Sequence, residues 1–289
     1  MVIPVYGQWD LVKRNIDALL KFDRELIAEI LAVNDCSPSK NPHVFDEDIV
    51  TIIENERNLG YTGTVNNGLR KSSSRIVVLL DSDAYPISPF IQKLTAMYES
   101  DQTIGSIGFA TVDDDGNDTG NYQYESSILG LIAGQALEAK FGYLRFWRNR
   151  NILPNSCAVS FRKTCLEELG YFDEQNFPVL EADVDLSMRI HRSKWKQLFT
   201  REIVICHRGG YSYKIDYKRV SLFHRSKWSL LKKHGLLPFP ALAKAAIKGR
   251  IRVELIMGKL MSITSSHDTS YAEKIKGRKI LIKEVDSYN

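Results

Sequence analysis

The sequence predicts an α/β fold, in which a mixed, mostly parallel central sheet is flanked by helices and followed by a helical C-terminal extension. Over residues 1–212, short apolar runs of strand-forming residues alternate with amphipathic stretches, as in strands joined by helical crossovers. After Ser212 the chain becomes basic, and its apolar residues take a helical spacing. The 289 residues, 44% hydrophobic and 26% charged, can bury a sizeable core, which excludes a disordered or fibrous protein.

Four apolar runs are the expected early strands, at residues 2–6, 27–33, 50–53 and 76–80. Ser88 followed by Pro89 predicts a helix start, with serine as the N-cap and proline at the first helical position. Thr164 and Glu167 have the spacing of a capping box, and Gly170 is the expected end of that short helix. Residues 112–126 are polar and lack a period, which predicts a long surface loop or a mobile lid.

Charge is distributed unevenly along the chain. Residues 1–200 carry 20 basic and 28 acidic side chains, whereas residues 201–289 carry 19 basic and seven acidic ones. We therefore expect a cationic C-terminal part on an acidic body. No nucleic-acid-binding module is recognisable, so nucleic acid is not an expected partner.

Cysteine usage and the N-terminus favour a cytoplasmic location. The four cysteines stand singly, without a C-x-x-C pair, which predicts reduced thiols. The chain starts directly on an apolar run, without the basic region and cleavage site of a signal peptide. No apolar run approaches the ~20 residues of a membrane span, so any membrane contact is expected to be peripheral.

The tripeptide Asp81-Ser82-Asp83 directly follows the buried-strand run at 76–80. If the strand geometry persists, alternate side chains point the same way, and two carboxylates converge at the carboxyl edge of the sheet. Open α/β sheets bind ligands at this edge, and paired carboxylate oxygens suit Mg²⁺ or Mn²⁺ held against a diphosphate. The alternative for the tripeptide alone is a solvated turn.

Further motifs occur in one order along residues 2–212. They are Val2-Ile3-Pro4-Val5-Tyr6, Val33-Asn34-Asp35-Cys36-Ser37, Asn58-Leu59-Gly60-Tyr61, Val65-Asn66-Asn67-Gly68, Leu79-Leu80-Asp81-Ser82-Asp83, Gly170-Tyr171-Phe172-Asp173-Glu174, Asp183-Val184-Asp185-Leu186-Ser187-Met188-Arg189 and Cys206-His207-Arg208-Gly209-Gly210-Tyr211-Ser212. In this order and spacing the chain resembles the family 2 glycosyltransferases of GT-A fold, particularly their rhamnosyltransferase-like branch. The resemblance implies a Rossmann-like GT-A catalytic domain at 1–212, with a nucleotide-sugar half at about 1–110 and an acceptor half at about 111–212, and a basic helical extension at 213–289.

The resemblance also implies roles for individual residues in binding the nucleotide sugar. Pro4, Val5, Tyr6 and Asp35 would hold the nucleoside, with Asp35 at the base and Asn58, Gly60 and Asn66 nearby. Within Asp81-Ser82-Asp83, Asp81 would face the ribose and Asp83 the metal, and His207 would be a second ligand of that ion. Neutral imidazole joins carboxylates readily around Mn²⁺. Taken alone, a histidine after the apolar run at 203–206 is more often a packed or surface residue.

Asp183 is the candidate general base, since inversion requires a carboxylate to take the proton of the acceptor hydroxyl. The family has Glu-Asp at this point, whereas this chain has Ala182-Asp183, with Glu181 one residue earlier. This departure leaves the acceptor contacts open and keeps Asp185 as a rival base. The alternative is an acidic first helical turn, in which Asp185 forms an i, i+4 pair with Arg189.

Two interpretations of the C-terminal extension remain open. Its basic residues are interleaved with apolar ones, namely Phe223, Trp228, Leu230, Leu231 and Leu237. Such a surface could lie on anionic lipid and reach a lipid-linked glycan acceptor. Alternatively, the apolar side packs on the catalytic domain or forms a homodimer contact.

These observations predict an inverting, metal-dependent glycosyltransferase. It would transfer a sugar from a UDP- or dTDP-linked donor to an acceptor hydroxyl in bacterial surface polysaccharide biosynthesis, at the inner face of the plasma membrane. The alternative is a catalytically silent domain that binds nucleotide or glycan and scaffolds a polysaccharide assembly complex. Dinucleotide oxidoreductases and P-loop enzymes are disfavoured because the chain lacks G-x-G-x-x-G after its first strand and G-x-x-x-x-G-K-[ST].

Overall fold

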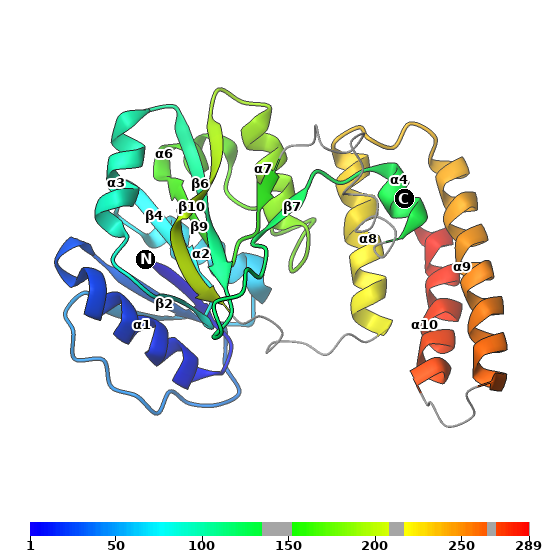
Figure 1. Ribbon diagram of the computed structural model, residues 1–289, viewed down its shortest axis with the longest axis horizontal. Helices are drawn as coiled ribbons and strands as arrows, with labels where there is room; N and C mark the ends of the chain where they lie inside the picture. Colours follow the sequence, from blue (N-terminus) through cyan, green and yellow to red (C-terminus); the bar gives the residue numbers. More distant parts are fainter. Residues whose placement is uncertain (135–151, 208–216, 265–269, 289) are drawn as a thin grey trace. The chain divides into compact units, whose positions relative to one another are not determined.

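A computed structural model describes residues 1–134, 152–207, 217–264 and 270–288 (Figure 1). The chain forms two compact units: Met1–Tyr124 with Ile152–Ser212, and Glu125–Asn151 with Tyr213–Asn289. A boundary after residue 212 was expected, but residues 125–151 were expected in the acceptor half. The physical reason for the difference is Leu131, which is buried in the same apolar cluster as Trp228 and Ile247 of the second unit.

The first unit contains the expected mixed, mostly parallel sheet, so the predicted fold class is confirmed. Its eight strands have the order β3-β2-β1-β4-β9-β6-β10-β5, and only β9 and β5 run antiparallel to their neighbours. The strands are β1 (Val2–Val5), β2 (Ile30–Asn34), β3 (Val50–Glu54), β4 (Ile76–Leu80), β5 (Ala84–Pro86), β6 (Ile104–Val112), β9 (Ala158–Arg162) and β10 (Lys196–His207). A separate antiparallel pair joins β7 (Tyr122–Tyr124) and β8 (Ile152–Pro154).

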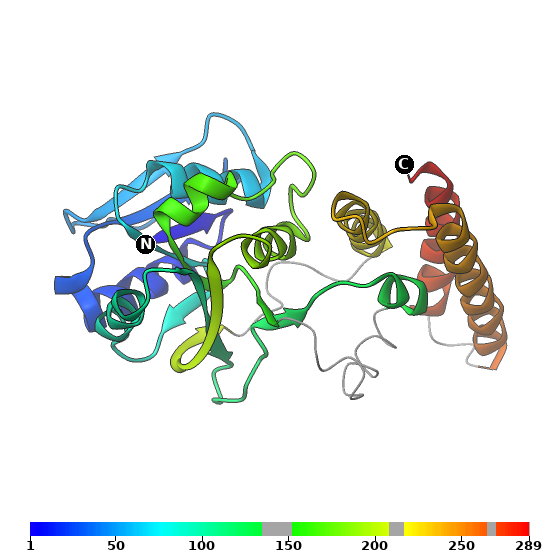
Figure 2. The ribbon, with the colours of Figure 1, turned by 90° about the horizontal axis from the view of Figure 1, so that it is seen from above.

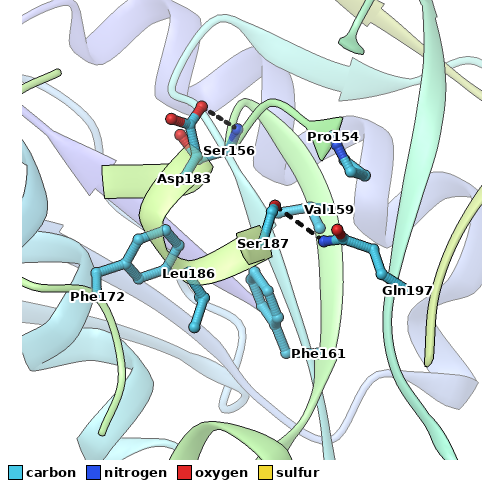
Figure 3. A pocket seen from close by; sticks show the side chains of 9 residues that line it. All are labelled: Pro154, Ser156, Val159, Phe161, Phe172, Asp183, Leu186, Ser187 and Gln197. Atoms are coloured by element: carbon cyan, nitrogen blue, oxygen red, sulfur yellow. Dashed lines mark hydrogen bonds between the residues drawn. The ribbon is translucent and has the colours of Figure 1, made fainter. Parts of the chain in front are cut away.

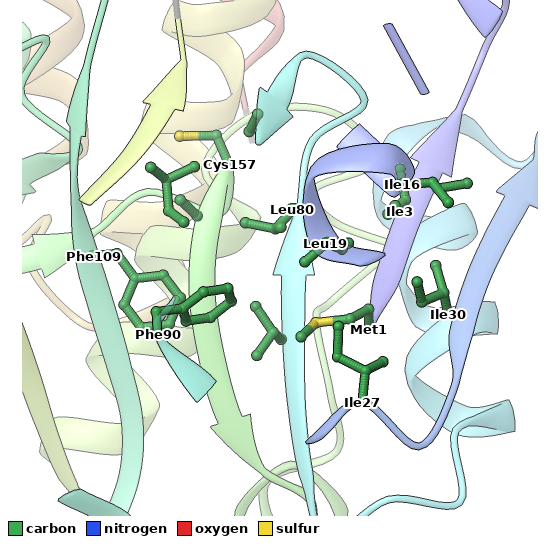
Figure 4. Close-up of a cluster of buried hydrophobic side chains, with 14 of the residues drawn as sticks. Met1, Ile3, Ile16, Leu19, Ile27, Ile30, Leu80, Phe90, Phe109 and Cys157 are labelled. Carbon is green, nitrogen blue, oxygen red and sulfur yellow. The ribbon is translucent and has the colours of Figure 1, made fainter. Parts of the chain in front are cut away.

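Helices flank the sheet of the first unit (Figure 2). They are α1 (Trp9–Asp23), α2 (Gly60–Lys71), α3 (Ile91–Ser100), α6 (Lys163–Leu169) and α7 (Ala182–His191), with a 3₁₀ turn at Arg24–Leu26. Helices α1 and α3 share one core with the sheet (Figure 4). In this core Leu19 lies near Leu80 and Ile16 near Ile3, and the rings of Phe90 and Phe109 meet edge to face with their centroids 5.9 Å apart. These apolar contacts hold the strand ends in place.

Helix α2 approaches the sheet very closely at Gly68. A Cβ atom on this residue would lie 2.5 Å from the Cγ1 atom of Val2 on β1 and 2.9 Å from the Cγ2 atom of Val33 on β2. Any larger residue would therefore push the helix away from the two strands. The glycine thus allows α2 to pack directly against β1 and β2.

Most of the expected strands are confirmed, but several boundaries and caps are different. The second strand begins at Ile30, because Arg24–Leu26 forms a 3₁₀ turn before it. Helix α3 begins at Ile91 instead of Pro89, and its first N–H groups are satisfied by Asp23, whose carboxylate accepts from the N–H groups of Phe90 (3.0 Å) and Ile91 (3.4 Å). A cap supplied by another helix leaves no local signal in the sequence.

The expected capping box of Thr164 and Glu167 is wrong, since the N-cap of α6 is Arg162, two residues before Thr164, and its side chain makes no bond to the helix. Gly170 ends this helix as expected, in the left-handed conformation. The expected loop at 112–126 is partly structured, because Val112 pairs with Asp118 in a β-bridge and β7 pairs with β8. Pairing partners distant in sequence order these residues, which polarity alone does not reveal.

The second unit is helical, as expected. Its elements are α4 (Ile128–Ala133), α8 (Tyr217–Lys233), α9 (Pro240–Thr264), α10 (Ser270–Glu284) and a 3₁₀ turn at Val285–Ser287. Trp228 and Leu231 of α8 and Leu237 after it are buried in the core of this unit, whereas Phe223 is half-buried. Among the helices of the described residues, none combines the length and apolar character that a membrane span requires.

Candidate active site

The carboxyl ends of β1, β2, β4 and β10 lie along one edge of the sheet, because these strands run in the same direction. Each is followed by a predicted site residue: Tyr6, Asp35, Asp81 and, at the end of β10, His207. The edge at which open α/β sheets bind ligands therefore collects the motifs that are scattered along the chain. The rest of the last motif, residues 208–212, lies outside the described residues.

The two aspartates of Asp81-Ser82-Asp83 converge, but not for the predicted reason. The strand geometry ends at Leu80, and the N–H group of Ala84 donates to the carbonyl oxygen of Asp81 at 3.0 Å, which closes a turn. The short strand β5 then pairs antiparallel with β10, which places Ala84 opposite His207. A tight turn and a new strand pairing, instead of continued strand alternation, bring these side chains together.

Asp81, Asp83 and His207 form a group that could hold one metal ion. A ligand atom from each lies within 4.8 Å of the other two, and Nε2 of His207 is 3.4 Å from Oδ1 of Asp83. Two carboxylate oxygens and one imidazole nitrogen are ligands suited to Mn²⁺. Burial lowers the pKa of His207, but its hydrogen bond to Asp83 and the two negative charges outweigh burial and raise it overall. The site thus attracts positive charge.

Asp81 lies in the most perturbed environment of the three. Burial raises the pKa of its carboxyl to about 6, although the hydrogen bond from Tyr61 and the charge of His207 oppose the shift. The Tyr61 hydroxyl donates to Oδ1 of Asp81 at 2.8 Å and also contacts Oγ of Ser156 at 3.0 Å. Desolvated carboxylates with nearby negative charges are typical of functional sites, where a bound cation offsets the cost.

Asp35 organises the loop that leads into α2. Its Oδ1 accepts from the N–H of Leu59 at 2.7 Å and its Oδ2 from the N–H of Gly60 at 2.9 Å. The Asn58 side chain donates to the backbone carbonyl of Asp35 at 3.2 Å, so Asn58 and Gly60 lie beside it as expected. The carboxylate therefore satisfies the first N–H groups of a helix that has no side-chain cap of its own.

The other residues predicted to bind the nucleotide sugar differ in how far they are buried. Pro4 and Val5 are buried in β1, whereas the Tyr6 side chain is 57% exposed just beyond the strand. Ser82 lies between the two aspartates in the turn and is partly exposed. Asn66 is fully buried in α2, where its side chain donates to the carbonyl oxygen of Phe172 and accepts from its N–H group. The structure brings Tyr6 and Ser82 to the edge but turns Asn66 into the protein.

Asp183 lies in the first turn of α7, near the aspartates that follow β4. Its Oδ1 accepts from the N–H of Val184 at 2.9 Å, and its Oδ2 receives a long 3.4 Å contact from the N–H of Ser156. Figure 3 shows its carboxylate at one end of a small pocket, turned toward Ser156, with Ser187 and Gln197 hydrogen-bonded at 3.0 Å farther along. Burial raises the pKa of Asp183, although the hydrogen bonds from the N–H groups of Val184 and Ser156 lower it.

Asp185 is not available as a rival base. It is fully buried, and its Oδ2 accepts from Nε of Arg189 at 2.9 Å, which confirms the predicted i, i+4 pair. Arg189 also donates to the carbonyl oxygens of Leu169 and Tyr171, which ties α7 to the loop after α6. Glu181 is buried and holds the N-cap position of α7 with a left-handed backbone, φ 69°. Asp183 is thus the acid of this turn that lines the pocket.

Sequence reasoning missed the roles of two residues. Tyr61 was recognised as part of a motif, but its contact with Asp81 depends on α2 lying beside the end of β4. Ser156 follows β8 in a segment without any motif, yet its hydroxyl contacts Tyr61 and its N–H faces Asp183. Together the two residues connect the aspartates after β4 with the acid of α7. Only the tyrosine left a signal in the sequence, its position directly after the Asn-Leu-Gly motif.

Solved structures with the same fold come from several glycosyltransferases. Mannosyltransferase PcManGT from Pyrobaculum calidifontis, in complex with GDP-Man and Mn²⁺, is similar with a TM-score of 0.57 and 14% identity, covering 97% of this chain and 84% of that one. S. aureus TarS 1-349 in complex with UDP-GlcNAc is similar with a TM-score of 0.55 and 12% identity, covering 99% of this chain and 82% of that one. GalNAc-T7 with UDP, GalNAc and Mn²⁺ is similar with a TM-score of 0.57 and 15% identity, covering 80% of this chain and 47% of that one.

Family membership follows from the sequence itself. No curated protein sequence matches the chain. The family model described as glycosyl transferase family 2 matches residues 1–170, the part that contains the nucleotide-side motifs and the Asp81-Ser82-Asp83 turn. This match covers more than half of the 289 residues, and the chain belongs to glycosyl transferase family 2.

Proposed function

We propose that the protein transfers a sugar from a nucleoside diphosphate sugar, UDP- or dTDP-linked, to an acceptor hydroxyl with inversion at the anomeric carbon. The observation that carries this proposal is the separation of two acidic groups at one edge of the sheet. Asp81 and Asp83 stand with His207 as a cation site, whereas Asp183 lies outside that group, with a raised pKa and access to a pocket. A donor site and a proton acceptor are thus provided by different carboxylates.

The nucleotide sugar would lie along the carboxyl ends of the strands, with its nucleoside near β1 and β2 and its ribose and diphosphate near the end of β4. The exposed ring of Tyr6 is available to the nucleoside, together with Pro4, Val5 and the loop that Asp35 holds at Asn58 and Gly60. Asp81 would take the ribose side, and Ser82 the segment between sugar and diphosphate. We leave Asn66 out of this set because its amide is engaged with Phe172.

Asp83 and His207 would hold Mn²⁺ or Mg²⁺, which when bound supplies the positive charge that stabilises a leaving diphosphate. The complexes of PcManGT with GDP-Man and Mn²⁺, and of GalNAc-T7 with UDP and Mn²⁺, support this assignment by analogy of fold. The negative environment formed by Asp81 and Asp83 favours a cation in any case. Mn²⁺ suits the imidazole better than Mg²⁺ does.

Asp183 would act as the general base in a single displacement. Its carboxylate takes the proton of the acceptor hydroxyl, the freed oxygen forms a bond to the anomeric carbon, and the bond from that carbon to the diphosphate oxygen breaks. Burial favours the protonated form, so the carboxylate is a stronger base than an exposed aspartate. The contacts from Val184 and Ser156 orient the group without neutralising its charge.

The acceptor would be a glycan or a lipid-linked glycan in bacterial surface polysaccharide synthesis, handled in the cytoplasm at the inner face of the plasma membrane. The family's acidic residue before Asp183 is replaced here by Ala182, which is buried. This position therefore offers no charged side chain to an acceptor. The silent-scaffold alternative rests on this departure alone.

A panel of UDP- and dTDP-sugars tests the proposal directly. With Mn²⁺ present, we expect release of nucleoside diphosphate from at least one α-linked donor, and a β-linked product by NMR of the anomeric proton. Simple sugars and polyprenyl-linked glycans serve as acceptors, and donor hydrolysis is measured without acceptor. A product of retained configuration would contradict the single displacement. Nucleotide binding without any turnover across the panel would favour the scaffold.

A further inference from the structure

Helix α9 carries an exposed apolar stripe. Of the 14 large apolar side chains that are exposed in the described residues, six lie between residues 239 and 260, and each of these is 55–68% exposed. They are Phe239, Leu242, Val253, Ile256, Met257 and Leu260. Single exposed apolar residues are ordinary on protein surfaces, but several on one face of a single helix usually mark an interaction surface.

The stripe is distinct from the face that α9 uses for packing. Ala243, Ile247 and Ile251 are buried in the core of the second unit, each four residues from the next. The exposed row follows a spacing of three, four and seven residues on another side of the same helix, as Val253, Ile256 and Leu260 illustrate. α10 contacts both α8 and α9, and α9 lies at the edge of this unit (Figure 1). A surface helix normally has one apolar face, whereas α9 has two.

Basic side chains border the stripe. Arg252 and Lys259 are exposed and lie seven residues apart, on one flank of the apolar row. The single acidic residue of α9 is Glu254, and Oε1 of this residue is 3.2 Å from Nη1 of Arg250 while its other oxygen accepts from Nε of Arg278. Residues 213–289 together carry 17 basic and six acidic side chains. The surroundings of the stripe are therefore cationic.

The basic surroundings of the stripe favour an anionic bilayer over a second copy of the chain as the surface that covers it. A second copy of the chain would present the same basic flank, and its only acid on α9 is already paired with two arginines. An anionic bilayer offers both an apolar interior for the stripe and negative headgroups for Arg252 and Lys259. Helices that lie in a membrane interface have this combination of apolar and basic residues.

We propose that α9 is a membrane-docking element, which inserts Leu242, Val253, Ile256, Met257 and Leu260 into the headgroup region of an anionic bilayer. The helix has 25 residues, roughly 38 Å, and would lie parallel to the membrane plane. Phe239, directly before it, adds an aromatic side chain of the kind that anchors at interfaces. This inference goes beyond the transfer reaction and does not depend on it, since docking requires neither donor nor acceptor.

Vesicle co-sedimentation of the full chain tests the proposal. We expect binding to phosphatidylglycerol vesicles and little binding to phosphatidylcholine vesicles. The double substitution Ile256→Ser and Leu260→Ser should lower the partition coefficient at least about tenfold, or ~1.4 kcal/mol. Both residues are exposed, so the variant should unfold at the temperature of the wild type. The matched control, Leu26→Ser with Val44→Ser, removes equally exposed apolar residues of the first unit and should bind normally.

A second pair of variants separates the charge contribution. Arg252→Gln with Lys259→Gln should weaken binding to phosphatidylglycerol and reduce its salt dependence, whereas Lys40→Gln with Lys71→Gln, at exposed positions of the first unit, should change neither. Failure of the wild type to bind phosphatidylglycerol vesicles at low salt would overturn the proposal. So would a dimer in sedimentation equilibrium that Ile256→Ser with Leu260→Ser dissociates, since the stripe would then be covered by a second copy.

Discussion

Replacing Asp183 by asparagine is expected to reduce sugar transfer by about 10²- to 10⁴-fold, the usual contribution of a positioned general base. Asparagine keeps the shape of the side chain and can still accept from the N–H groups of Val184 and Ser156, but it cannot take a proton. Nucleotide affinity should stay nearly unchanged, because Asp183 lies outside the Asp81, Asp83 and His207 group. Steady-state kinetics and nucleotide titration measure the two effects separately.

The pH dependence of transfer provides a second readout of the same role. The base must be deprotonated, and burial raises the pKa of Asp183, so transfer should decline with falling pH at a higher pH than an ordinary aspartate would give. In Asp183→Asn the small residual rate should lack this step. The control is Asp115→Asn, at an exposed turn residue, which should keep the wild-type rate and profile. Unchanged turnover by Asp183→Asn would remove the residue from the mechanism.

Replacing Arg189 by methionine is expected to destabilise the protein by about 3 to 5 kcal/mol, because it leaves the buried carboxylate of Asp185 without its guanidinium. The change also removes the bonds from Arg189 to the carbonyl oxygens of Leu169 and Tyr171. Urea unfolding, followed by circular dichroism, measures the free energy of unfolding. We expect a lower urea concentration at the unfolding midpoint and a largely unchanged dependence of the free energy of unfolding on urea concentration.

An exposed pair of the same spacing provides the control. Lys13 and Asp17 lie 2.7 Å apart on α1 with both side chains about half exposed, and Lys13→Met should cost no more than ~0.5 kcal/mol. The double variant Asp185→Leu with Arg189→Met should be more stable than Arg189→Met alone, since it buries no unpaired charge. Equal effects of Arg189→Met and Lys13→Met would show that the buried pair has no special role in stability.

Features that depend on local sequence were predictable. The strands at 2–5, 50–54 and 76–80 and the helices α8 and α9 follow from apolar spacing, and the position of Asp81 after a strand follows from the run that precedes it. The parallel direction of β1, β2 and β4 then places Tyr6, Asp35 and Asp81 on one edge. The pair of Asp185 with Arg189 needed only the helical spacing of four residues.

Features that depend on distant partners were not predictable. The convergence of Asp83 with His207 requires β5 to pair with β10, and three residues give too short a strand to identify from the sequence. The cap of α3 comes from Asp23 on another helix, and Asn66 is drawn inward by Phe172, about a hundred residues away. Trp228, Leu230 and Leu231 of α8 were considered for lipid contact, yet they are buried, while the exposed stripe lies on α9. Periodicity shows that a face is apolar but not what covers it.

In the proposed donor site, Asp83 and His207 hold a divalent ion against a nucleoside diphosphate, with Asp81 on the ribose side. Calorimetric titration of UDP into the protein, with Mn²⁺ and with EDTA, tests it most directly. We expect Mn²⁺ to tighten UDP binding by about tenfold or more, ~1.4 kcal/mol, and Asp83→Asn to abolish this gain while Asp115→Asn retains it. Equal UDP affinity with Mn²⁺ and with EDTA, or a full Mn²⁺ effect in Asp83→Asn, would contradict the account.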